Sequence, residues 1–108
     1  MKLFELVNYF RNGGSFTEFC KEQALNENAE VIEIYMKQDL EIDNDLSFFE
    51  IENTEGSYEY LNKGEKYFSL FDFYFFLDAI EESNDDGNKK LSNEKITKLL
   101  YDYAVNDG

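Results

Sequence analysis

The chain has 108 residues and a formal net charge of −14, because 24 acidic side chains outnumber ten basic ones. It contains no His, no Pro, no Trp and a single Cys, which excludes Ser-His-Asp triads, Cys-His nucleophiles and zinc sites built from Cys and His. The aromatic fraction of 18% is too high for a disordered acidic tail, and the length suits one folded domain over residues 1–108.

Two helices are predicted near the N-terminus. The first is indicated by apolar residues at helical spacing, namely Leu3, Leu6, Val7 and Phe10. The Asn-Gly-Gly segment at 12–14 ends it, because Gly adopts the left-handed conformation that closes a helix. Ser15 and Glu18 then form a capping-box pattern, and the second helix is predicted to run to about Leu25. Cys20 lies on the apolar face of this helix and is expected to be a core residue.

Residues 28–38 fit two patterns. One helical face would carry Val31, Ile32, Tyr35 and Met36. The alternation of Ile32, Ile34 and Met36 fits a strand equally well. We favour a helix, because Ala, Glu, Met and Lys in this segment are good helix formers. Residues 39–45 are expected to form an acidic connector.

Residues 47–68 are predicted to form a short three-stranded antiparallel meander. Alternating apolar and acidic or basic residues indicate strands at 49–52, 58–60 and 66–68. The turns at 53–56 and 62–65 each contain a Gly, which suits the positive φ that tight hairpins require. Such a meander has one polar, acidic face.

Two further helices are predicted at the C-terminus. The first follows a second capping pattern at 69–72 and continues to about Glu82, apolar on nearly all sides, which is typical of a central core helix. Ser92 begins the last helix, whose apolar positions are Ile96, Leu99, Leu100 and Tyr103. The predicted fold class is therefore α+β in one small domain, with an all-α bundle as the alternative.

Neither a membrane span nor a signal peptide is predicted. The most apolar run, 67–80, contains two Asp residues and is shorter than the ~20 residues of a membrane helix. Glu5 and Arg11 bracket an apolar stretch that is too short for a signal peptide. A lone Cys fits a reducing compartment. We therefore expect a cytoplasmic protein without a membrane partner.

Catalysis and metal binding are not expected. A carboxylate pair for glycoside hydrolysis or a magnesium site remains available, but 24 carboxylates make chance pairings plentiful. Residues 82–94 resemble a calcium-binding EF-hand loop when Gly87 is aligned with its invariant glycine. Lys89 then takes an apolar position and Asn93 replaces the bidentate glutamate, so an ordinary loop is predicted. We expect a protein that is not an enzyme and uses no cofactor.

The negative charge is concentrated between residues 27 and 60, where eleven acidic side chains accompany Lys37 alone. Direct binding to nucleic acid is disfavoured, because the few basic residues are scattered. Carboxylates beside tyrosines, which are preferred interface anchors, suit a basic protein partner. The candidate partner-binding residues are Tyr35, Asp43, Asp45, Glu50, Glu52, Glu55, Tyr58, Glu59, Tyr60 and Tyr67. The other interpretation is a solvated face that maintains solubility.

The opening segment Leu3-xx-Leu-Val-xx-Phe-Arg-Asn-Gly-Gly-Ser-Phe-Thr-Glu-Phe19 resembles the helix–turn–helix start of colicin-D-like immunity proteins. Small, acidic, aromatic-rich, His-poor chains are also similar to bacterial immunity proteins against toxins of the contact-dependent inhibition class. The resemblance implies tight one-to-one inhibition of a basic, nuclease-type toxin by an acidic surface. A phage-encoded nucleic-acid mimic that inhibits a CRISPR effector or a restriction enzyme is one alternative. A cellular adaptor or regulatory domain is another.

Overall fold

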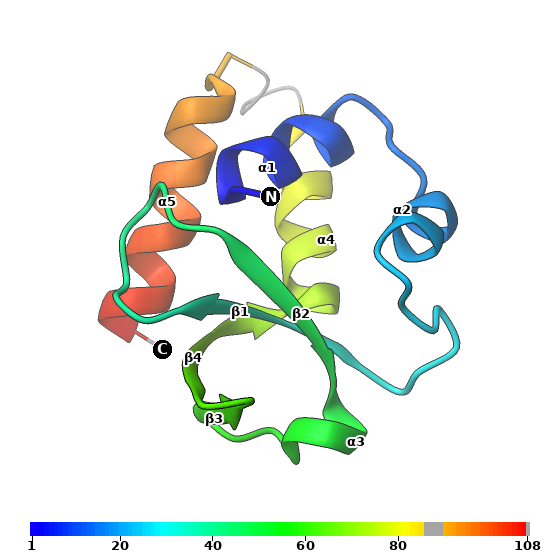
Figure 1. Cartoon of the computed structure of the whole chain (residues 1–108). Helices are drawn as coiled ribbons and strands as arrows, with labels where there is room; N and C mark the ends of the chain where they lie inside the picture. Colours follow the sequence, from blue (N-terminus) through cyan, green and yellow to red (C-terminus); the bar gives the residue numbers. More distant parts are fainter. Residues whose placement is uncertain (86–89, 108) are drawn as a thin grey trace.

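Within residues 1–85 and 90–107, which are the residues that the computed structural model describes, the chain forms five helices and four strands (Figure 1). In chain order they are α1 (Leu3–Arg11), α2 (Phe16–Glu22), β1 (Ile32–Lys37), β2 (Leu46–Glu50), α3 (Ile51–Thr54), β3 (Glu59–Asn62), β4 (Glu65–Asp72), α4 (Phe73–Ser83) and α5 (Asn93–Asp107). The predicted α+β class is confirmed, and the sheet rules out the all-α alternative.

The two N-terminal helices form where the local signals predict them. Gly13 has a φ of +88° directly after α1, and the Ser15 hydroxyl accepts a hydrogen bond of 3.2 Å from the backbone N–H of Glu18. Helix α2 ends at Glu22 rather than near residue 25, because Ala24 adopts a positive φ of 57°. Cys20 is 2% exposed, which confirms it as a core residue.

The prediction of a helix over residues 28–38 is wrong, because this segment supplies the strand β1. The sheet is antiparallel with strand order β2-β1-β4-β3, so β1 pairs with a strand on each side. All residues from Ile32 to Met36 are buried, whereas a surface helix would have buried one face only. Tertiary packing has therefore overridden the helix propensity of the segment.

The predicted meander is correct in its second half and wrong in its first. Strands β3 and β4 form a hairpin whose turn contains Gly64 at a φ of +83°. The first predicted strand does not pair with the second, because β1 and β4 lie between β2 and β3. The predicted turn at 53–56 is instead the end of α3 and its continuation, in which Glu55 and Gly56 have positive φ.

Helix α4 begins three residues later than a capping pattern at 69–72 would place it. Asp72 is itself the N-cap, and its side chain accepts a hydrogen bond of 2.8 Å from the backbone N–H of Phe75. Leu70 and Phe71 therefore belong to β4, which pairs with β1 up to Asp72. The start of α5 follows the prediction, since the Ser92 hydroxyl accepts from the N–H of Lys95.

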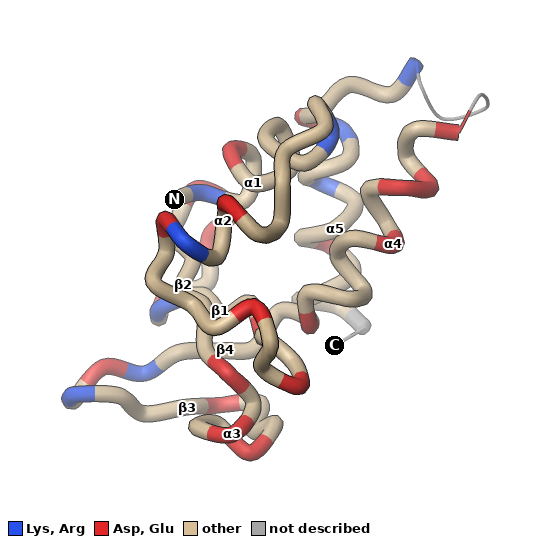
Figure 2. Tube along the Cα trace, turned by 90° about the vertical axis from the view of Figure 1, so that its right-hand side faces the viewer, with Lys and Arg blue, Asp and Glu red and all other residues tan. Residues whose placement is uncertain are grey.

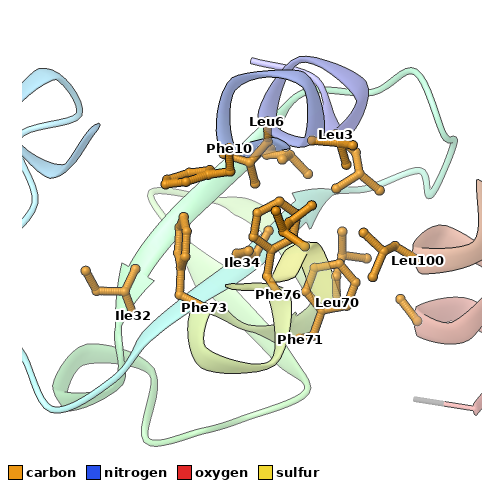
Figure 3. Close-up of a cluster of buried hydrophobic side chains, with 14 of the residues drawn as sticks. Leu3, Leu6, Phe10, Ile32, Ile34, Leu70, Phe71, Phe73, Phe76 and Leu100 are labelled. Atoms are coloured by element: carbon orange, nitrogen blue, oxygen red, sulfur yellow. The ribbon is translucent and has the colours of Figure 1, made fainter. Parts of the chain in front are cut away.

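The main core lies between one face of the sheet and the helices α1, α2, α4 and α5. β1 contributes Ile32, Ile34 and Met36 from this face. Figure 3 shows Phe10 of α1 close to two rings of α4, with ring centroids 5.7 Å from Phe73 and 5.9 Å from Phe76. Edge-to-face contacts of this kind add to the free energy that apolar burial supplies.

The opposite face of the sheet curls on itself, as the ring formed by β1, β2, α3, β3 and β4 in Figure 1 shows. The rings of Phe49 and Tyr60 come from the two edge strands, yet their centroids are 4.9 Å apart. Tyr35 from the central strand and Tyr67 complete this aromatic cluster. The curl brings α3 over the second face of β1.

Arg11 joins α1 to the end of α4 and the start of α5. Its guanidinium donates to the carbonyl oxygens of Ser83, at 3.0 Å, and of Leu91, and to the side-chain oxygens of Asn84 and Asn93. Several of these groups are partly buried, and each loses a charged donor if the side chain is removed.

We expect Arg11→Ala to lower the free energy of unfolding by about 2–3 kcal/mol, since each partly buried acceptor left without a donor costs about 1 kcal/mol or more. Arg11→Lys keeps the charge but loses the forked donor, and should recover less than half of this loss. Urea unfolding at neutral pH measures both variants. A loss below about 0.5 kcal/mol for Arg11→Ala would show that the contacts are not stabilising.

Candidate functional site

The structure places the predicted partner-binding residues at separate positions rather than on one surface. Asp43 and Asp45 precede β2, where the amino group of Met1 lies 3.4 Å from Asp45 Oδ1. Glu50 ends this strand and Glu52 follows it, so both lie about 17 Å from its start, because five residues rise ~3.4 Å each. Asp43 and Asp45 therefore do not share a surface with Glu50 and Glu52.

Tyr35 does not belong to any surface, and its assignment as a contact residue is corrected. Its side chain is 0% exposed, because the curled sheet covers the second face of β1. Its hydroxyl donates a hydrogen bond to the carbonyl oxygen of Ser57, and burial raises its pKa. The Thr54 hydroxyl similarly donates to the carboxylate of Glu33, which is 7% exposed. These two contacts hold α3 and the residues after it against the sheet.

The β3–β4 hairpin holds acidic residues that are already paired. Lys66 lies 3.8 Å from Glu59, and Lys37 lies 3.3 Å from Glu65. The remaining candidates of the hairpin, Tyr60 and Tyr67, are half-buried in the aromatic cluster. Of the other candidates, Glu55 is exposed at the end of α3, and Tyr58 is 49% exposed beside β3. The hairpin thus adds little to the excess negative charge.

The segment between α2 and β1 lies beside α3 and brings further acidic residues to it. The backbone N–H of Asn26 donates to Glu50 Oε2 and that of Glu30 to Glu52 Oε1, both at 3.4 Å. Glu27 and Glu30 are exposed in this segment. Carboxylates from two parts of the chain therefore lie together.

Helix α4 continues this negative surface. The hydroxyl of Tyr74 donates to the carbonyl oxygen of Glu30 at 3.3 Å, which joins α4 to the segment before β1. Asp78 and Glu81 follow Tyr74 at i+4 and i+7, so the three exposed side chains lie along one side of the helix. Figure 2 shows acidic residues along α4, on α3 and between α2 and β1.

We call this surface the acidic face and define it by six carboxylates, which are Glu27, Glu30, Glu50, Glu52, Asp78 and Glu81. Among residues 1–85 and 90–107, no ion pair links any of the six to a Lys or Arg side chain. Sequence reasoning found two of them and missed four. The signals were the outward spacing of residues 74, 78 and 81 and the absence of Lys and Arg from 67 to 88.

A cleft of about 140 Å³ opens beside the acidic face. Its lining consists of Phe16, Glu27, Ala29, Ile32, Phe73, Tyr74 and Leu77. The carboxylate of Glu27 is held at its edge by a hydrogen bond of 2.7 Å from the Thr17 hydroxyl. The acidic face therefore combines exposed carboxylates with an apolar recess and an exposed tyrosine.

Neither a metal centre nor a membrane helix is present in the part of the chain that the structure describes. Those residues contain no cluster of three or more potential metal ligands among His, Cys, Asp and Glu. The candidate calcium loop at 82–94 includes residues 86–89, which lie outside the described residues. None of the described helices has the length and apolar character needed to cross a bilayer.

Cys20 is buried near Glu27, and its thiol should be unreactive in the native protein. Burial raises the pKa of the thiol, and the nearby Glu27 carboxylate raises it further. The reactive thiolate is therefore scarce at pH 8. We expect alkylation by iodoacetamide to be about a hundredfold slower than in concentrated urea, because it requires local opening. Mass spectrometry over time measures both rates, and rates within about threefold would contradict the burial.

Comparison with known proteins finds no matching protein-family model, no matching curated protein and no matching solved structure. The similarity of the opening segment to immunity proteins stays a prediction. The functional proposal for this chain therefore rests on the charge and shape of the acidic face.

Proposed function

We propose that the protein is an acidic inhibitor that neutralises a basic, nuclease-type toxin by covering its active site, as immunity proteins do. The observation that carries this proposal is the acidic face, whose six carboxylates lie on adjoining segments and form no ion pair with a Lys or Arg side chain of the described chain. Like charges gathered in this way repel one another and destabilise the free protein. A partner that presents Lys and Arg relieves this repulsion when it binds.

A nuclease is the partner class that best suits such a surface. Proteins that hold nucleic acid gather Lys and Arg to neutralise its phosphates, and carboxylates can occupy the same groove. The excess negative charge steers a basic protein toward the surface and raises the association rate. In this role the protein acts in the cytoplasm, binds no nucleic acid or membrane itself, uses no cofactor and catalyses no reaction.

The test measures inhibition of a nuclease rather than binding alone. Basic proteins encoded by genes adjacent to that of this chain are purified, and their cleavage of plasmid DNA and tRNA is measured as the protein is added. We expect one cleavage activity to be lost at a one-to-one ratio. The association rate should fall at least about tenfold between about 50 mM and 500 mM NaCl, because salt screens the charges.

The same measurements separate the alternatives. Inhibition that duplex DNA overcomes by competition, directed at a restriction enzyme or a CRISPR effector, would assign the protein to the nucleic-acid mimics. Binding to a neutral partner that is unaffected by salt would favour an adaptor. If no nuclease activity is inhibited, the proposal of an immunity function fails.

A further inference from the structure

The cleft beside the acidic face is built from three separate parts of the chain. Phe16 comes from the start of α2, Ala29 from the segment before β1, and Leu77 from α4. Ile32 and Phe73, which Figure 3 labels, form its apolar inner wall. The ring centroids of Phe16 and Phe73 are 5.1 Å apart, so aromatic packing holds α2 and α4 at this distance.

The edge of the cleft carries the Glu27 carboxylate, and one of its two oxygens accepts a hydrogen bond within the described chain. Glu27 Oε2 accepts a hydrogen bond from Thr17, whereas Oε1 accepts none from residues 1–85 and 90–107. Asp78 lies on α4 next to the lining residue Leu77 and one turn beyond Tyr74. A cation at the mouth of the cleft would meet the Glu27 carboxylate, which is the charged group of the lining.

The exposed tyrosine at the edge is held in a defined position. Tyr74 lines the cleft and is 63% exposed, which is unusual for a large aromatic side chain on a core helix. Its hydroxyl is bound to the carbonyl oxygen of Glu30, so the ring is fixed by a contact at its far end. The face of such a ring attracts a planar cation.

We propose that the cleft accepts one arginine side chain of the basic partner, an inference that rests on the proposed function. The aliphatic part of the side chain packs against Phe16, Ala29 and Leu77. The guanidinium stacks on the Tyr74 ring and donates hydrogen bonds to Glu27 Oε1. An arginine held in the cleft fixes the position of the partner on the acidic face. The other contacts of this face are between flexible charged side chains.

Other occupants fit the cleft less well. An apolar side chain would remove water from the Glu27 carboxylate without replacing its hydrogen bonds, which is costly. An acidic side chain would be repelled. Lysine brings a charge but neither the planar group that stacks on a ring nor the fork that binds a carboxylate. Charge and shape together therefore select arginine.

The test compares labelled peptides of four Arg-Gly repeats with peptides in which every Arg is replaced by Lys, Leu or citrulline. Fluorescence anisotropy at low salt gives the dissociation constants, and amide NMR shifts locate the binding site. We expect the Arg peptide to bind about fivefold or more tightly than the Lys peptide, because stacking on Tyr74 favours guanidinium. The largest shifts should fall on Ala29, Tyr74 and Leu77.

A matched pair of variants separates the cleft from the general negative charge. Glu27→Gln and Glu52→Gln each remove one charge from an exposed side chain of the acidic face, but only Glu27 lines the cleft. We expect Glu27→Gln to weaken Arg-peptide binding about tenfold and Glu52→Gln by at most about threefold, since only Glu27 is placed to form a charged hydrogen bond with the bound arginine. Tyr74→Leu should abolish the preference for Arg over Lys.

Several results would overturn the arginine site. They are equal affinity for the Arg and Lys peptides, equal effects of the two Gln variants, stronger binding of the Leu peptide, or no peptide binding. If such a result accompanies full inhibition of a nuclease, the proposed function stands and the cleft proposal alone fails. Selective binding of the Arg peptide without inhibition of any nuclease would support the arginine site and contradict the proposed immunity function. Thermal unfolding confirms that each variant is folded.

Discussion

Reversing three charges of the acidic face, with Glu30→Lys, Glu52→Lys and Asp78→Lys, will weaken inhibition of the basic partner at least about a hundredfold. The three side chains are exposed, lie in the segment before β1, in α3 and in α4, and form no ion pair with a Lys or Arg side chain of the described chain. Lysines at these positions repel the partner and remove the steering that accelerates association. The inhibition constant of the nuclease at low salt measures the effect.

The same triple variant should be more stable than the natural protein when it is free. Each reversal adds two charge units, so the net charge changes from −14 to −8 and the repulsion within the face decreases. We expect a higher midpoint of thermal unfolding at low salt and a smaller rise of this midpoint on adding salt. A loss of inhibition with a gain in stability cannot be explained by unfolding.

A matched triple variant serves as the control. Glu41→Lys, Asp43→Lys and Glu94→Lys change the net charge equally, but Asp43 and Glu94, which is in the first turn of α5, line a cleft that shares no residue with the acidic face. This variant should keep inhibition within about threefold, because distant exposed charges are screened by salt. If it weakens inhibition as strongly as the first triple, net charge rather than the acidic face is responsible.

Replacing Tyr35 will destabilise the fold rather than remove a partner contact. Tyr35→Ala should lower the free energy of unfolding by about 3–5 kcal/mol, because it empties the centre of the aromatic cluster inside the curled sheet. Tyr35→Phe should cost about 1–2 kcal/mol, since the carbonyl oxygen of Ser57 loses its donor. Urea unfolding at pH 8 measures both, and Tyr58→Ala, at a side chain that is 49% exposed, is the control for the loss of an exposed tyrosine.

Alkaline pH gives a second test of the burial of Tyr35. Burial raises the pKa of its hydroxyl above the ordinary value of 10.0, which applies to the unfolded chain. Between these two values the native protein holds a proton that the unfolded chain has lost, so stability falls as the pH rises. Tyr35→Phe has no such proton, and its deficit relative to the natural protein should shrink above about pH 10. A constant deficit from pH 8 to pH 11 would contradict the burial.

The elements that could be predicted are those whose signals lie within a few residues. Ser15 and Ser92 each accept a hydrogen bond from a backbone N–H three residues later, so the cap and the helix that follows are one local unit. The hairpin around Gly64 is local in the same sense, because its strands are adjacent in the chain.

The strand β1 could not be predicted in this way, because its stability comes from elsewhere in the chain. Ile32, Ile34 and Met36 face the helices, whereas Tyr35 faces the curl of the sheet. β2 and β4 supply its hydrogen bonds from 10 to 39 residues away. Helix propensity is a weak preference, and burial of both faces outweighs it.

The acidic face shows the same division between local and distant effects. The sequence by itself determined the net charge of −14, the absence of His, the capped helices and the α+β class. Only the tertiary structure decided which carboxylates share a surface, because the extended strand β2 separates Asp43 from Glu52 and the contact between Tyr74 and Glu30 joins α4 to the segment before β1. Charge is counted along the chain, but the field that a partner meets depends on distances in space.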